Sequence, residues 1–197
     1  MSAAFAEADA RGLGFAIRAA SVLFVAVLTA AAAQVSIHLP FTPVPLTLQP
    51  MVVLLGAAAL GPHLGALSQL LYLAAGIAGL PVFAFSAVLP QGAGRLLGPT
   101  GGYLMSYPAA AFVTGWLALR GFDRRYFTSV LAMLAGLVVV YAGGVLWLAA
   151  FVPGGPGLGG ALHAGVYPFV LADVVKLAVA AAVLPGIWRL TGLGRRA

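Results

Sequence analysis

Cysteine is absent from the sequence and charged side chains are scarce: the 197 residues include ten Lys and Arg but only four Asp and Glu. Without cysteine the chain has no disulfide, thiolate metal site, iron–sulfur cluster or cysteine nucleophile. Apolar residues are abundant instead, because 62% of the chain is hydrophobic and the mean hydropathy is +1.08. This combination excludes a soluble domain of this length and is typical of a polytopic membrane protein.

Motifs for enzyme chemistry are also missing. There is no GxxxxGK(S/T) phosphate loop, no GxSxG motif and no paired acids. The string GPGLGG at 155–160 formally fits GxGxxG, but no strand precedes it and a proline interrupts it, so we interpret it as a loop. His38, His63 and His163 are dispersed, and a metal site from His38 and His163 is an alternative to solvated loop histidines. We therefore expect no enzyme, no cofactor and no metal.

Long apolar runs predict the fold. Five runs are long enough to cross a hydrocarbon layer of about 20 helical residues. They cover residues 15–37, 62–80, 102–119, 127–151 and 165–190. A sixth run, 46–61, is short and begins inside the proline-broken stretch HLPFTPVPLTLQP, so part of it must be irregular or shielded by protein. Counting it gives six transmembrane helices, of which the second is short.

The basic residues support an even number of spans. They give a net charge of +6 and a pI of 10.3, but they lie in short loops between apolar runs, which argues against a nucleic-acid partner. With both termini cytoplasmic, most of them fall inside, as the positive-inside rule requires. These inside residues are Arg11, Arg18, Arg120, Arg124, Arg125, Arg189, Arg195 and Arg196. Only Arg95 is then left outside, and Lys176 lies within a span.

The expected organisation is an all-α, multi-pass protein of the cytoplasmic membrane, embedded in the lipid bilayer with both termini in the cytoplasm. Residues 1–14 form a cytoplasmic lead-in, about 15–190 form the six-helix core, and 1–197 is a single integral membrane domain. The Gly- and Pro-rich loops 81–101 and 152–164 face outward in this topology. We therefore expect a substrate opening on the outer side.

Two ionisable side chains interrupt the last apolar run. In VLADVVKLAVA, Asp173 and Lys176 stand at i and i+3, on one helix face, where they can neutralise each other. Such residues usually mark a site in a membrane protein, although a helix-locking ion pair is the alternative. Arg95, in QGAGRLLGPTGGY, is a third charge on the outer side or else a snorkelling arginine. Together the three suit an anionic ligand that also carries neutral hydrogen-bonding groups.

Polar and aromatic residues near the broken segments are further candidates for an amphipathic pocket. Taken singly, each is also typical of packing or of an interfacial aromatic belt. The set is Gln49, Gln69, Tyr72, Phe83, Tyr103 and Tyr167. Gln49 and Tyr103 are favoured, because irregular backbone at membrane depth is tolerated only where protein or a cavity covers it.

Four further segments are distinctive in sequence and in order: PFTPVPLTLQ (40–49), LGALSQLLYLAAGIAGLPVF (64–83), GPTGGYL (98–104) and ADVVK (172–176). They resemble segments of the BioY family that occur in the same order, and the resemblance covers about residues 15–190. BioY is the biotin-specific substrate-capture component, or S component, of energy-coupling factor transporters. The resemblance implies six helices, an outward-facing cavity, and partners comprising a transmembrane coupling protein and two ATPase subunits. It also implies that Asp173 and Lys176 hold the ureido ring of biotin and that Arg95 meets its carboxylate.

Small residues spaced four apart recur in the first span, as the pairs Ala16/Ala20 and Ala26/Ala30. They permit close approach of another helix and resemble the AxxxA coupling surface of S components. Packing within the chain explains them equally well.

The leading hypothesis is a protein that binds biotin with high affinity from outside and delivers it when a separate module supplies energy. The first alternative is a self-sufficient secondary transporter of a vitamin or other small carboxylate, in which Asp173 and Lys176 switch protonation. Further intramembrane acids would favour that alternative, and the sequence has none. A transferase with Asp173 as base is a third possibility, for which no donor site is recognisable.

Overall fold

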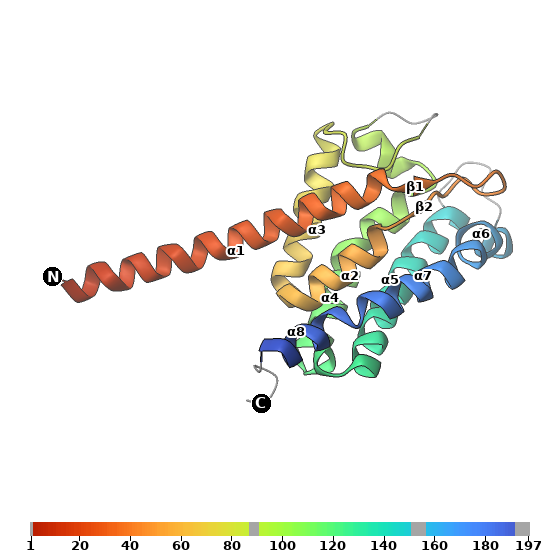
Figure 1. Ribbon diagram of the computed structural model, residues 1–197. Helices are drawn as coiled ribbons and strands as arrows, with labels where there is room; N and C mark the ends of the chain where they lie inside the picture. The colour runs from red at the N-terminus through yellow and green to blue at the C-terminus, as the bar shows by residue number, and fades with distance from the viewer. Residues whose placement is uncertain (1, 87–90, 151–156, 192–197) are drawn as a thin grey trace.

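The computed structural model describes residues 2–86, 91–150 and 157–191. Helices dominate it, joined by short turns, with one small hairpin (Figure 1). The elements are α1 (Ser2–Gln34), β1 (Ser36–Ile37), β2 (Leu46–Thr47), α2 (Gln49–Leu60), α3 (Pro62–Ile77), η1 (Ala93–Leu97), α4 (Gly101–Leu119), η2 (Phe122–Arg124), α5 (Tyr126–Ala150), α6 (Gly157–Gly165), α7 (Tyr167–Ala180) and α8 (Val183–Thr191).

A two-stranded hairpin follows α1. Its antiparallel strands pair Ser36 with Thr47 and Ile37 with Leu46. The connecting stretch is rich in proline, which cannot supply the N–H that a continuing helix requires, so the chain turns back before α2 begins. The mostly helical fold thus contains one hairpin that was not expected, with β1 just before the proline-broken stretch and β2 within it.

The expected short second helix is α2. Its 12 residues span roughly 18 Å at about 1.5 Å per residue, well short of a hydrocarbon core. A single residue, Gly61, separates it from α3 and has φ 80°, a backbone conformation that favours glycine. A Cβ added to Gly115 on α4 would lie 2.5 Å from the backbone carbon of Gly61, so α4 packs directly against this corner.

Helices α4 and α5 pack closely at the centre of the molecule. A Cβ at Gly102 would collide with the carbonyl oxygen of Gly143, and one at Gly136 would collide with Thr114, so glycine lets the two backbones approach. The buried core around this contact includes Val53, Leu54, Ala110, Ala111, Met133, Leu137 and Val140. This core places the polar residues of α5 next to those of α7 and the hairpin.

The last expected span, 165–190, is divided into α7 and α8, which are separated by residues 181–182. The segment 152–164 was expected to be a loop, but α6 occupies most of it. Three stretches of the described residues are long and apolar enough to cross a membrane: Gly12–Gln34, Tyr126–Ala150 and Tyr167–Ile187.

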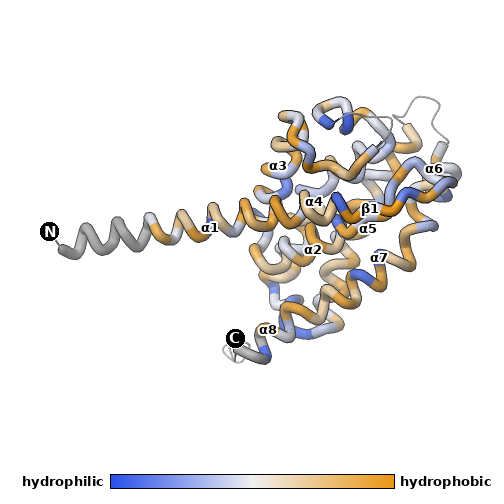
Figure 2. Tube along the Cα trace, turned by 45° about the horizontal axis from the view of Figure 1, so that its top comes forward, coloured by the Kyte–Doolittle hydropathy of each residue, from blue (hydrophilic) through white to orange (hydrophobic). Residues whose placement is uncertain are grey.

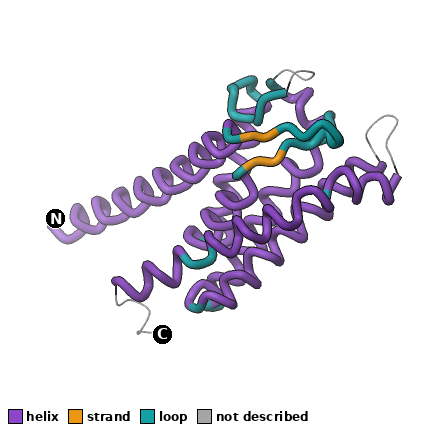
Figure 3. Tube along the Cα trace, turned by 45° about the vertical axis from the view of Figure 1, so that its right-hand side comes forward, coloured by secondary structure: helices purple, strands orange, loops and turns teal. Residues whose placement is uncertain are grey.

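The two ends of the molecule differ in chemistry. Arg120, Arg124 and Arg125, between α4 and α5, lie at one end, together with α8 (Figure 1). The hairpin, η1 and α6 gather at the other end, where Figure 3 shows the strands beside loop segments. Apolar residues, orange in Figure 2, dominate the helices between the ends. Large apolar side chains such as Phe15, which is 76% exposed, cover the exterior, as a bilayer solvent requires.

Candidate ligand-binding site

A cavity of about 510 Å³ lies at the hairpin end of the molecule. Its walls come from the hairpin, the 83–86 segment, η1, and helices α4, α5 and α7. Apolar side chains such as Leu104, Val140 and Phe169 make up much of the lining. Asp173, Arg95 and Gln49 add a few polar groups, which is the usual composition of a small-molecule site.

The hairpin lines this cavity, and the segment between its strands is held by hydrogen bonds on two sides. Thr42 Oγ1 donates a hydrogen bond to the carbonyl oxygen of Ala164 at 2.5 Å. His38 Nε2 lies 3.0 Å from the carbonyl oxygen of Phe85, across the cavity mouth. The segment between the two strands therefore connects α6 with the 83–86 segment.

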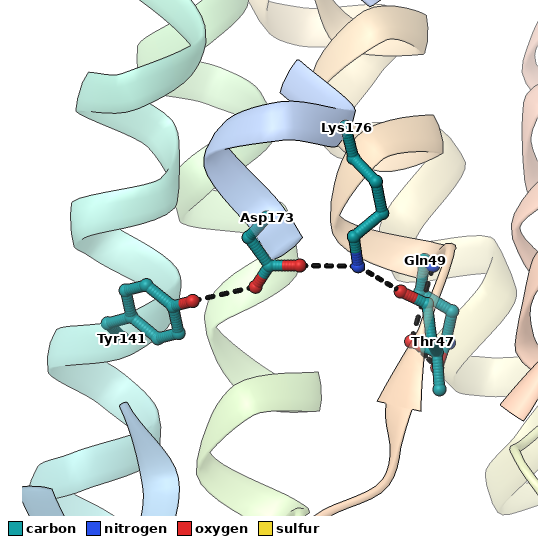
Figure 4. A network of polar contacts seen from close by, with 5 residues as sticks. All are labelled: Thr47, Gln49, Tyr141, Asp173 and Lys176. Carbon is teal, nitrogen blue, oxygen red and sulfur yellow. Dashed lines mark hydrogen bonds and ion pairs between the residues drawn. The ribbon is translucent and has the colours of Figure 1, made fainter. Parts of the chain in front are cut away.

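The Asp173/Lys176 pair forms on α7, as its i, i+3 spacing predicts. Lys176 Nζ lies 2.5 Å from Asp173 Oδ1, and the two side chains are only 15% and 6% exposed. Lys176 Nζ also donates to the carbonyl oxygen of Thr47 at 2.7 Å. Tyr141 on α5 donates to Asp173 Oδ2 at 2.7 Å. Figure 4 shows the continuous chain of contacts from α5 through α7 to the hairpin.

This arrangement lowers the cost of burying charge, because each ion has the other and a neutral partner. The Asp173 Oδ1 atom has no hydrogen bond besides its ion pair among the described residues. A carboxylate oxygen accepts two hydrogen bonds, and an ammonium group donates three. By this count each Asp173 oxygen keeps one acceptor position and Lys176 keeps one donor; of the two residues, Asp173 is the one that lines the cavity.

Gln49 lines the cavity at the start of α2, and Tyr72 lies behind it. Gln49 Nε2 donates to the Tyr72 hydroxyl at 2.6 Å, and Thr47 Oγ1 donates to Gln49 Oε1 at 3.4 Å. Tyr72 is 1% exposed and is not part of the cavity wall. It supports the orientation of Gln49 and does not face the cavity.

Arg95 and Phe83 form the wall on the side of η1. The Arg95 side chain is buried, and its Nη2 atom donates to the carbonyl oxygen of Ala84. Burial lowers the pKa of the Arg95 guanidinium from its ordinary value, because it removes water from around the charge. The Phe83 ring packs on Gly76, where a Cβ would collide with it, and meets Tyr72 edge-on with the centroids 5.5 Å apart.

Tyr103 also lines the cavity, and its hydroxyl donates to the carbonyl oxygen of Gly165 at 2.8 Å. Its ring occupies the space that a Cβ would take at Gly144. Tyr167, by contrast, is 60% exposed, packs against His163 and does not line the cavity. Gln69 is also elsewhere, fully buried, with its Nε2 donating to Ser68 and Thr29.

Sequence reasoning did not identify Tyr141, Tyr107 or Thr47 as site residues, yet all three line the cavity. Tyr141 had one usable signal, because a hydroxyl in the apolar run LVVVYAGGV needs a partner at that depth. Thr47 had none, since it contributes its backbone carbonyl to Lys176.

The alanine pairs of α1 are in two different environments. Ala26 is 6% exposed within the core and Ala30 packs partly buried against it, which fits the packing alternative and does not fit a partner surface. Ala16 and Ala20 are exposed. Ala20 also lines a second, apolar groove of about 570 Å³ between α1, α2 and α8.

Comparison with known proteins identifies the family. The model of the BioY family matches residues 6–192, nearly the whole chain. The chain belongs to the BioY family. The relative from Pyrococcus horikoshii, a probable biotin transporter BioY, is 46% identical over 159 residues, which cover 80% of this chain and 87% of that one. The biotin transporter BioY of Thermotoga maritima is 42% identical over 148 residues, which cover 75% of this chain and 82% of that one.

A solved structure extends the likeness to three dimensions. The crystal structure of the S-component for biotin from an ECF-type ABC transporter matches with a TM-score of 0.78 and 25% identity, covering 89% of this chain and 93% of that chain. This BioY chain is therefore a membrane protein with the S-component fold. Since the BioY relatives are transporters, the expectation that the chain is not an enzyme is confirmed.

Proposed function

We propose that the chain binds biotin on the outer side of the cytoplasmic membrane and takes it up as the S component of an energy-coupling factor transporter. The observation that carries this proposal is the Asp173/Lys176 ion pair, of which the buried Asp173 lines a largely apolar cavity, in a member of the BioY family. Nothing in the sequence supplies energy for uptake, so the chain depends on partners for it.

Biotin matches the chemistry of the cavity group by group. Its ureido ring carries two N–H donors for Asp173 and one carbonyl acceptor for Lys176, whose ammonium has a third donor besides those used on Asp173 and Thr47. Its carboxylate suits the Arg95 guanidinium. Its thiophane ring and valeryl chain suit the apolar wall that includes Phe83 and Phe169.

The proposed orientation has six crossings, both termini in the cytoplasm and the cavity open to the outside. The arginines between α4 and α5 support it, because they lie at the end opposite the cavity and belong inside by the positive-inside rule. Helices α7 and α8 together would form the sixth crossing, and α2 the short second one. The hairpin, η1 and α6 would then face the outer solution.

The proposed partners are a transmembrane coupling protein and two ATPase subunits, in addition to biotin and the lipid bilayer. We place the coupling surface at Ala16 and Ala20 of α1, where exposed small residues permit close approach of a partner helix. The apolar groove beside Ala20 extends that surface toward α2 and α8.

Equilibrium binding of radiolabelled biotin to the purified chain in detergent or nanodiscs tests the proposal. We expect saturable binding that excess unlabelled biotin removes and excess pantothenate, also a carboxylate, does not. Absence of saturable binding by folded protein would contradict it. Uptake into proteoliposomes that contain this chain alone, driven by a proton gradient, would instead favour the self-sufficient secondary transporter.

A further inference from the structure

The hydroxyl of Tyr141 is placed to control one side chain of the proposed site. It lies on α5, lines the cavity and donates to Asp173 Oδ2 at 2.7 Å (Figure 4). Lys176 holds the other carboxylate oxygen, Oδ1, at 2.5 Å. The two oxygens of Asp173 therefore each have one protein donor, and these donors come from different helices.

A carboxylate held at both oxygens has a fixed plane. The terminal torsion of an aspartate is otherwise broad, so a single contact with Lys176 leaves rotation about that bond largely free. With both donors in place, each oxygen of Asp173 keeps one acceptor position, and the two positions point in fixed directions. A planar ligand with two N–H groups at a set spacing binds a fixed carboxylate better than a carboxylate that rotates freely.

We propose that Tyr141 is a positioning residue that fixes the plane of the Asp173 carboxylate for the N–H groups of the ligand. The inference rests on the proposed function, because it takes the ureido ring of biotin as that ligand. Tyr141 acts through Asp173 and does not recognise the ligand itself: its proton is used on Oδ2, so its hydroxyl has no donor left for the ureido carbonyl.

Titration of biotin against Tyr141→Phe tests this role. The substitution removes one oxygen atom and keeps the ring, so we expect affinity to fall roughly fivefold to twentyfold, less than for loss of a charged hydrogen bond to the ligand itself, because Asp173 keeps its charge. Tyr126→Phe is the matched control, on the same helix and 38% exposed, and it should bind as the parent does. Thermal unfolding without ligand should be similar for all three proteins.

Two further measurements separate positioning from direct contact or packing. In an Asp173→Asn background, adding Tyr141→Phe should change affinity less than about twofold, because the two residues act as one unit. A biotin analogue methylated on one ureido nitrogen should be disfavoured by the parent, and Tyr141→Phe should reduce that discrimination. A merely structural tyrosine would weaken both ligands alike.

Each remaining outcome overturns the role. Parent-like affinity of Tyr141→Phe, or a full effect of it in the Asp173→Asn background, would show that the hydroxyl does not act through Asp173. Failure of Tyr141→Phe to fold would assign the hydroxyl to the fold. If the folded parent does not bind biotin, the proposed function itself is wrong. If the parent binds and the variant binds equally well, only the role of Tyr141 is wrong.

Discussion

Lys176 on α7 donates from Nζ to the backbone carbonyl of Thr47 at 2.7 Å, although the two residues are 129 positions apart in the chain. The same ammonium is ion-paired with Asp173 in the cavity wall. The lysine thus joins the proposed ligand site to the last residue of the hairpin that covers it. Loss of the Lys176 side chain therefore affects both the ligand site and the hairpin, whereas loss of the Asp173 charge affects only the ligand site.

Replacement of Lys176 by Met should therefore loosen the hairpin as well as weaken binding. The variant removes the donor to Thr47 and leaves Asp173 without its ion pair. We expect biotin affinity to fall at least about tenfold, by more than 1.4 kcal/mol. Hydrogen exchange by mass spectrometry should show faster exchange in peptides that cover 36–49. In the comparison variant Asp173→Asn the lysine remains, so these peptides should stay protected; equal exchange in both variants would contradict the link.

Gly144 makes room for the ring of Tyr103, and its replacement by alanine should disturb the cavity wall. A Cβ there would collide with that ring, which cannot move without breaking the hydroxyl bond to Gly165. We expect a loss of about 1–3 kcal/mol in stability from overpacking, with weaker biotin binding. Thermal unfolding and titration measure both. Gly159→Ala on α6 is the control, since nothing lies within 4 Å of its added Cβ; equal effects of the two alanines would refute the packing argument.

The topology is directly testable because the parent chain has no cysteine. Single cysteines at Leu158, which is 59% exposed on α6, and at Arg125, between α4 and α5, report on opposite ends. We expect an impermeant maleimide to label the first in intact cells and the second only after permeabilisation. Labelling of residue 158 from the inside alone would reverse the proposed orientation.

The two alanine pairs should respond differently to a large side chain. Ala20→Trp enlarges an exposed position, so biotin binding should persist while copurification of the coupling protein and biotin uptake are lost. Ala26→Trp inserts bulk into the core at a position that is 6% exposed, so it should lower stability first. If Ala20→Trp still assembles and transports like the parent, the coupling surface lies elsewhere.

The sequence was most informative where a residue conflicts with its surroundings. Asp173 and Lys176 are recognisable because charge in an apolar run is costly, and their spacing alone places them on one helix face. The short α2 was equally accessible, since the prolines before it limit where a helix can begin.

Other features depend on contacts between distant segments, which no local pattern reveals. The sequence indicates that the hydroxyl of Tyr141 needs a partner, but that this partner is Asp173 follows only from the packing of α7 against α5. The β1–β2 hairpin has strands of two residues, too short for an alternating pattern. The exposed placement of Tyr167 depends on which side of α7 meets the cavity. Helix α6 was hidden because its glycines favour a loop interpretation.

Biotin titration of Asp173→Asn and of Asp173→Asn/Lys176→Met, beside thermal unfolding, tests the central claim most directly. If the pair serves the ligand, the single variant should bind about tenfold to over a hundredfold more weakly, a loss of about 1.5 to 3 kcal/mol, and the double variant should not recover. A pair that serves only the helix predicts poor folding of the single variant and rescue in the double. A double variant that folds well and binds biotin like the parent would contradict the account.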